Sequence, residues 1–173
     1  MIDLWSVKMS RTSKKKKSSN NEQKNSLSPE ILKCLYELAE EGHKLTHEEK
    51  YMEAIHVWNK AIELIPEPKQ NFFETAKFYE GIAYNYQMMN LFTEAMDYMN
   101  KALRCWGDEA NKNPFTLRNL GEIYYELGDM ERSLDYLRKA YNLEGDEIFY
   151  SDEYGKIDHN KYFEILKKKI NLE

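Results

Sequence analysis

Two histidines, His43 and His47, come closest in this chain to a chemical motif. Four residues apart on a helix, they would present two imidazoles on one face, as some zinc sites do. A zinc site needs a third ligand, however, and the metalloprotease order places a glutamate between the histidines, whereas Glu48 and Glu49 follow them here. We therefore expect no metal at this pair and interpret the histidines as exposed or lining a groove.

The remaining residues offer no other catalytic pattern. The sequence has no glycine-rich phosphate loop and no nucleophile elbow, and neither Cys34 nor Cys105 can be matched to a catalytic base. The two cysteines are far apart within helical patterns, so we expect reduced, buried thiols. The acidic segment SDEYGKID, residues 151–158, lacks calcium-loop spacing and is expected to be a solvated connector. The sequence thus predicts a protein that is not an enzyme and holds no cofactor.

Charge divides the chain into a basic start and an acidic remainder. Residues 1–25 carry seven Lys or Arg against two acids, whereas the other 148 residues carry 18 against 28. The start has almost nothing apolar after Trp5, so we expect residues 1–28 to form a disordered basic tail. The run Lys14–Lys17 would suit a nuclear localisation signal, a nucleic-acid arm or a membrane-surface patch. Because no aromatic residues are interleaved with it, a solubilising tail is the preferred interpretation.

Composition favours one helical domain. Of the 173 residues 42% are hydrophobic, which suffices for a continuous core, and only seven glycines and four prolines interrupt the chain. No apolar run approaches the roughly 20 residues that span a bilayer, and the apolar part of MIDLWSVK is too short for a signal peptide. We therefore expect a cytoplasmic protein without a membrane segment.

One helical segment is written three times, starting at Tyr51, Phe92 and Met130. The conserved spacing of its apolar residues is that of one helical face, with small side chains where a neighbouring helix must approach closely. A second helical segment precedes each copy, so the unit is a helix pair that buries its surplus apolar surface by stacking on the next pair. The aligned columns include Ala54, Ala95 and Ser133; Trp58, Met99 and Leu137; and Ala61, Ala102 and Ala140.

This arrangement resembles the tetratricopeptide repeat, an antiparallel helix pair of about 34 residues with a pattern of Trp, Leu-Gly, Tyr, Ala, Phe, Ala and Pro. Registered on the alanine columns, the copies occupy residues 35–68, 76–109 and 114–147. The matching residues are Gly42, Ala54, Trp58 in place of Phe, Ala61 and Pro66 in the first copy; Tyr86 in the second, where Ala83 replaces the glycine; and Leu120, Gly121, Tyr124, Gly128 and Ala140 in the third.

The segments around the copies complete the predicted architecture. Because Phe72, Ala76 and Tyr79 keep helical spacing through the insert between the first two copies, we expect this insert to lengthen a helix. After the third copy, a helix at about residues 159–171 is expected to cap the array. The predicted fold is all-α: a right-handed α-solenoid of about three tetratricopeptide helix pairs plus a C-terminal capping helix, in a domain over residues 29–173.

The resemblance also implies a binding surface. In repeats of this kind, the first helix of each pair lines a concave groove. Ala39 and His43 stand where a chaperone-tail clamp would need Lys and Asn, so we do not expect that clamp. Aromatic side chains flanked by carboxylates suit a protein or peptide with apolar anchors and some positive charge. The residues named as partner-binding are Tyr36, His43, His47, Tyr84, Met88, Phe115, Arg118, Glu122 and Tyr125.

Two functions of different class follow. The first is a non-catalytic protein–protein interaction module whose groove binds a peptide or protein. The segment IFYSDEYGKIDHNKYFEILK, with the short array, also looks like a group of small bacterial repeat proteins, some of which are immunity proteins that neutralise toxins. The second is a nucleic-acid-associated adaptor that uses the basic tail. The acidic body favours the first function, and Tyr36 and Phe115 could instead pack against a neighbouring helix or the cap.

Overall fold

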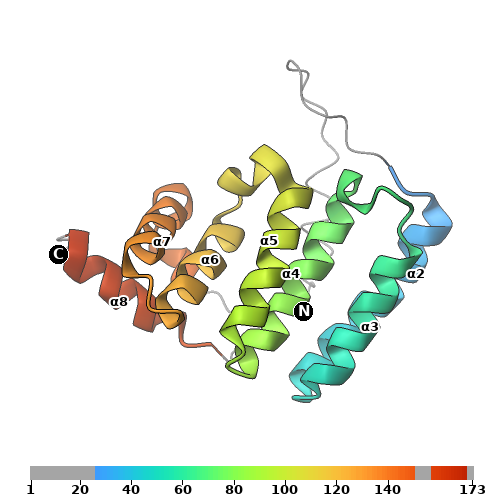
Figure 1. The fold of residues 1–173 in the computed structure, drawn as a ribbon, viewed down its shortest axis with the longest axis horizontal. Coiled ribbons are helices and arrows are strands. Elements are labelled where there is room, and N and C mark those ends of the chain that lie inside the picture. Colours follow the sequence, from blue (N-terminus) through green and yellow to red (C-terminus); the bar gives the residue numbers. More distant parts are fainter. Residues whose placement is uncertain (1–25, 151–156, 171–173) are drawn as a thin grey trace.

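The computed structural model describes residues 26–150 and 157–170, so residues 1–25 of the expected tail lie outside this range. Within it the chain is helical and contains no strand. Figure 1 shows the helices side by side in a row. They are α2 (Pro29–His47), α3 (Tyr51–Leu64), α4 (Phe73–Met88), α5 (Phe92–Trp106), α6 (Pro114–Glu126), α7 (Met130–Glu144) and α8 (His159–Ile170), with short 3₁₀ helices η1 (Lys69–Asn71), η2 (Gly107–Lys112) and η3 (Gly145–Phe149).

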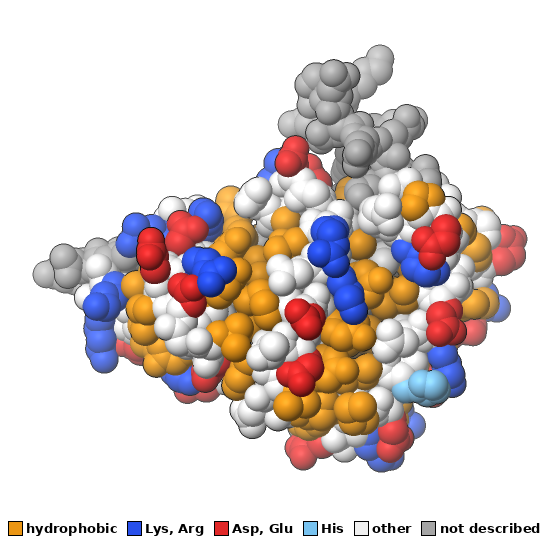
Figure 2. Space-filling model, in the orientation of Figure 1, with side chains coloured by type: hydrophobic (Ala, Val, Ile, Leu, Met, Phe, Trp, Pro, Cys, Tyr) orange, Lys and Arg blue, Asp and Glu red, His pale blue; other side chains and the backbone are white. Residues whose placement is uncertain are grey.

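The long helices pack as three successive pairs, α2 with α3, α4 with α5 and α6 with α7, and each pair stacks on the next. The predicted fold class is confirmed: an all-α, right-handed solenoid of helix pairs, followed by a C-terminal helix. Figure 2 shows hydrophobic side chains that reach the surface along the seams between helices, with acidic and basic side chains around them. None of the described helices is long and apolar enough to cross a membrane.

Local sequence explains where the helices begin. The Ser28 side chain accepts a hydrogen bond from the Ile31 amide, and Pro29 follows at the first helical position. Asn113 and Pro114 repeat this arrangement at the start of α6. At α7, the Asp129 carboxylate accepts from the Arg132 amide at 3.0 Å, and this backbone hydrogen bond is the first cause that holds the pKa of Asp129 below its usual value.

The turn inside each helix pair uses the same backbone conformation. Glu49, Asn90 and Gly128 occupy equivalent repeat positions and all have positive φ, at 62°, 57° and 82°. Asparagine and glycine adopt this conformation readily, whereas glutamate pays a steric penalty there. The turn therefore keeps the same backbone conformation in all three repeats, even where its residue is glutamate, which disfavours positive φ.

The insert between the first two pairs differs from the prediction. It forms a loop with η1, and α4 begins only at Phe73, so the insert mainly adds a loop and not a helix extension. Pro66 and Pro68 interrupt the helical pattern here. Lys69 folds back over the end of α3, and its Nζ donates to the carbonyl oxygens of Ile62 and Ile65 at 3.0 and 2.7 Å. The loop thus places a cation at the negative end of α3.

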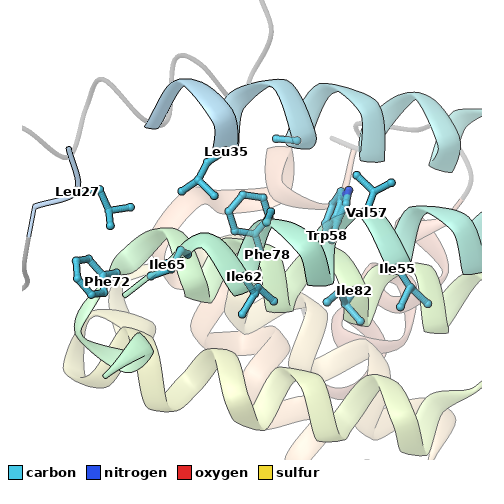
Figure 3. Close-up of a cluster of buried hydrophobic side chains, with 12 residues drawn as sticks. Leu27, Leu35, Ile55, Val57, Trp58, Ile62, Ile65, Phe72, Phe78 and Ile82 are labelled. Carbon is cyan, nitrogen blue, oxygen red and sulfur yellow. The ribbon is translucent and has the colours of Figure 1, made fainter. Parts of the chain in front are cut away.

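The core around the first two pairs is built on Trp58. Its indole lies 4% exposed between α2 and α4, in edge contact with Phe78 at a centroid distance of 6.4 Å (Figure 3). A β-carbon at Gly42 of α2, or at Gly81 of α4, would fall on the indole ring. These two glycines therefore provide the space in which α3 inserts its largest side chain.

In the other two repeats, smaller side chains make the equivalent contact between the two helices of a pair. Gly121 lies against Leu137, where a β-carbon would come within 2.7 Å of the leucine side chain. In the second repeat the equivalent pair is Ala83 and Met99, both fully buried. The size of the residue on the second helix thus follows the space that the first helix leaves.

The two cysteines do not share one environment. Cys105 is buried, as expected, but Cys34 is exposed. The prediction was wrong for Cys34 because it lies on the outer side of α2, the first of the described helices, and no described helix packs over that side.

Gly81→Ala should destabilise the protein although alanine is the better helix former. The added methyl group would overpack the indole, at a cost of about 1–3 kcal/mol that exceeds the propensity gain of about 1 kcal/mol. Thermal melting followed by circular dichroism should show a lower midpoint. Trp58→Leu makes room for that methyl, so the Trp58→Leu/Gly81→Ala double variant should lose clearly less stability than the two single losses combined. Additive losses would contradict the contact.

Candidate functional site

The predicted groove residues lie on α2, α4 and α6, the first helices of the three pairs, and we call their common surface the inner face. It is most exposed on α2. Tyr36 and His47 on α2 are exposed; His43, Met88, Phe115 and Tyr125 are half-buried; and Tyr84, Arg118 and Glu122 are buried, the last two 6% and 1% exposed.

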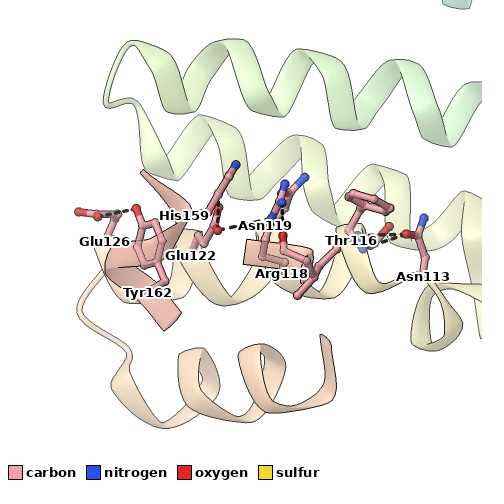
Figure 4. A network of polar contacts seen from close by, with 10 residues as sticks. Asn113, Thr116, Arg118, Asn119, Glu122, Glu126, His159 and Tyr162 are labelled. Atoms are coloured by element: carbon pink, nitrogen blue, oxygen red, sulfur yellow. Dashed lines mark hydrogen bonds and ion pairs between the residues drawn. The ribbon is translucent and has the colours of Figure 1, made fainter. Parts of the chain in front are cut away.

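The burial on α6 comes from the C-terminal segment. His159 Nδ1 of α8 lies 2.6 Å from Glu122 Oε1, and both side chains are almost inaccessible to solvent (Figure 4). The Arg118 guanidinium shares the same carboxylate, with Nε 3.5 Å from Oε1, and donates from its NH1 group to the Ile148 carbonyl oxygen at 2.7 Å. Arg118 and Glu122 thus fasten η3 and α8 to α6.

A second group of contacts lies one turn further along α6. Glu126 Oε1 accepts from Lys161 Nζ at 2.6 Å and from the Tyr162 hydroxyl at 2.8 Å. The Tyr162 ring meets Tyr125 edge to face at 5.6 Å, and the Lys161 ammonium lies 5.1 Å from the centre of the Tyr125 ring. Burial, followed by the nearby carboxylates, raises the pKa of Tyr162 far above its usual value, so its hydroxyl stays protonated and donates.

The second repeat contributes a different polar contact to the inner face. Glu80 Oε1 accepts from Trp106 Nε1 at 2.9 Å and also from the Thr116 hydroxyl, so one carboxylate joins α4 to α5 and α6. Thr46 and Asn85, on α2 and α4, form a buried hydrogen bond at 3.0 Å. These contacts fix how the successive first helices lie against one another.

The histidine pair does not form a metal site with described residues. His43 packs edge to face on Trp58 at 5.2 Å. No group of three or more His, Cys, Asp or Glu side chains in the described ranges is arranged to hold a metal ion.

The geometry of three stacked helix pairs agrees with a comparison of the sequence with known families. Residues 74–143 match the tetratricopeptide repeat. The match covers the second and third helix pairs. Repeats of this kind generally mediate protein–protein interaction and are typically non-enzymatic scaffolds. No curated protein matches the chain.

Sequence reasoning missed the residues that α8 brings to the inner face. The helix at 159–171 was predicted from its apolar face, and Phe163 and Leu166 are indeed buried. The predicted site does not include His159, Lys161 or Tyr162, although charge gives a signal for them: basic and aromatic side chains on one helix match the carboxylates of α6. The other observation that would have helped is that Glu122 and Glu126 are four residues apart and so share one helical face.

Glu122→Ala should loosen the C-terminal segment. It leaves the buried Arg118 without its carboxylate, which typically costs about 3 kcal/mol and corresponds to a drop in melting temperature of roughly 6–12 °C. Amide hydrogen exchange in residues 159–170 should accelerate more than exchange in α2 or α4. Glu131→Ala, at an exposed position in the first turn of α7, is the matched control and should melt within about 2 °C of the parent. Unchanged exchange in α8 would contradict this role of Glu122.

Proposed function

We propose that this protein is a non-catalytic interaction module that binds a peptide or protein on its inner face. The observation that carries the proposal is that α6 already holds a helix of the same chain there. Side chains of α8 contact α6 directly. His159 lies in hydrogen-bond contact with Glu122, Lys161 and Tyr162 donate to Glu126, and the Tyr162 ring packs against Tyr125. The α6 part of this face thus shows that the first helices can hold an added helix through polar and ring contacts, and the α2–α4 part offers aromatic and imidazole side chains for a partner.

A partner would lie on the α2–α4 part of the face, because α8 covers the α6 part. This assigns the partner contacts to Tyr36, His43, His47 and Met88, and leaves Arg118 and Glu122 with the structural role described above. Tyr36 is 43% exposed and lies near the start of α2, whereas His47 ends the same helix, so together they bracket the proposed site. Tyr84 is only 9% exposed and would contribute mainly by supporting its neighbours.

Tyr36→Ala combined with His47→Ala should weaken the partner complex at least roughly thirtyfold, since an aromatic anchor typically contributes about 2 kcal/mol or more. The partner is first isolated by affinity purification from the native source, and its affinity is then measured by calorimetry. Both positions are exposed, so the variant should melt within a few degrees of the parent.

Asp135→Ala is the control for this experiment. Asp135 lies on α7, where its carboxylate pairs with Lys139 at 2.6 Å on the exposed surface, and its loss should leave binding unchanged. Normal binding by a folded Tyr36→Ala/His47→Ala variant would move the partner site away from the α2–α4 surface.

Two more specific functions are separated by simple measurements. A toxin-neutralising role is one form of this module, supported only by the likeness of the short array and its C-terminal segment to immunity proteins; it requires that the isolated partner be a toxin. A nucleic-acid adaptor would act through Lys14–Lys17, which lie outside the described residues. Phosphate binding weakens steeply with added salt, whereas binding through aromatic anchors does not, so a salt titration of the isolated complex distinguishes them.

A further inference from the structure

The α2–α3 end of the solenoid carries an open hollow of about 420 Å³, away from the residues of the inner face proposed to bind a partner. Leu45, Met52 and Val57 supply its apolar lining, and Met52 is 60% exposed. The remaining lining residues are Glu41, Glu53, His56 and Lys60. Figure 2 shows acidic and basic side chains interspersed over this end of the molecule.

The repeat alignment explains why the hollow exists. The positions of Leu45 and Val57 hold stacked tyrosine pairs in the other two repeats, Tyr86 with Tyr98 and Tyr124 with Tyr136, at centroid distances of 5.5 and 5.6 Å. Those tyrosines also pack against clusters that contain buried side chains of the preceding helix pair. In the first repeat the side chains are smaller, and within the described residues no helix precedes α2 to cover them.

The opposite end of the array is closed. Tyr141 of α7 stacks on Phe163 of α8 at 5.8 Å, and Leu166 of α8 is fully buried in the same cluster. Of the two ends of the described solenoid, the α2–α3 end alone therefore leaves an apolar seam accessible to another molecule.

We infer that a second copy of this chain docks at the hollow, so that two α2–α3 ends meet about a two-fold axis. The lining residues of α3 lie at positions 52, 53, 56, 57 and 60, which form one stripe along the helix. When two such stripes run antiparallel with the axis between His56 and Val57, Glu53 of each copy faces Lys60 of the other. Glu53 lies within electrostatic range of Lys50, but no salt bridge within the described residues includes Glu53 or Lys60.

This self-complementary charge favours a second copy over an unrelated helix. A rim of one sign would attract a partner of the opposite sign, whereas Glu and Lys placed symmetrically on one stripe match the same stripe reversed. Met52 supplies the apolar side chain that enters the partner's hollow. The contact involves one helix pair from each copy, so it belongs to the small interfaces and should form at micromolar or higher concentration.

The test is the mass of the full chain in solution, measured by sedimentation velocity between about 5 and 500 µM. The parent should rise with concentration from 20.7 kDa toward twice that value. Glu53→Lys alone and Lys60→Glu alone each place like charges opposite one another twice, and each should weaken the dimer roughly tenfold. An equimolar mixture of these two variants restores both opposite-charge pairs and should dimerise as well as the parent.

Met52→Glu tests the apolar part and should also weaken the dimer, by at least roughly tenfold. Its matched control is Leu143→Glu at an exposed position near the end of α7, which should dimerise like the parent. Circular dichroism of every variant should match the parent because all the changed side chains are exposed. A parent chain that stays at 20.7 kDa throughout the range overturns the proposal, as does a mixture of the charge variants that stays monomeric while the parent dimerises. Dimerisation that appears only after deletion of residues 1–25 would assign the hollow to that segment and would also overturn it.

Discussion

The insertion of Trp58 between two glycines is the contact on which the first half of the solenoid depends. The indole occupies a slot that exists because each of the two neighbouring helices lacks a β-carbon where it faces the ring. Gly42 on α2 and Gly81 on α4 supply that slot from two sides, so one side chain of α3 fixes the helix within its own pair and the position of the next pair. Because a close-packed core does not adjust easily to added volume, the spacing of these three helices is set by this residue.

The α6 end is held by a different kind of interaction. There the carboxylates of Glu122 and Glu126 bind side chains of α8, and Arg118 binds the backbone of η3, so the C-terminal segment is attached by charge as well as by its apolar face. A buried ion pair seldom adds much net stability over an apolar contact of the same volume, but it is expensive to break on one side. Such a network therefore specifies where α8 lies more than it strengthens the fold.

The architecture could be read from the sequence because it depends on periodic features. The alanine columns and the apolar faces around them predicted the helix pairs and the C-terminal helix, since close helix contacts select small residues at fixed spacing. Features that depend on a single position in the fold could not be predicted in this way. The spacing of Phe72, Ala76 and Tyr79 predicts a longer helix, but the chain before Phe73 forms a loop. Cys34 is exposed because α2 is the first of the described helices. The side chains predicted for the groove lie on α2, α4 and α6. The burial of Arg118 and Glu122 among them depends on where η3 and α8 pack against α6, which no local pattern encodes.

The distribution of tryptophan makes the two halves of the molecule spectroscopically unequal. The chain has three tryptophans, and the two within the described residues, Trp58 and Trp106, belong to the first two helix pairs. Trp58 lies in an apolar slot, while the Trp106 indole donates to Glu80, so both sense the packing of α2 to α5 directly. The third pair and the described part of the C-terminal segment contain tyrosine but no tryptophan. Emission from Trp58 and Trp106 therefore reports on the first two pairs. The Glu80 carboxylate, which Trp106 shares with Thr116, connects this signal to α6.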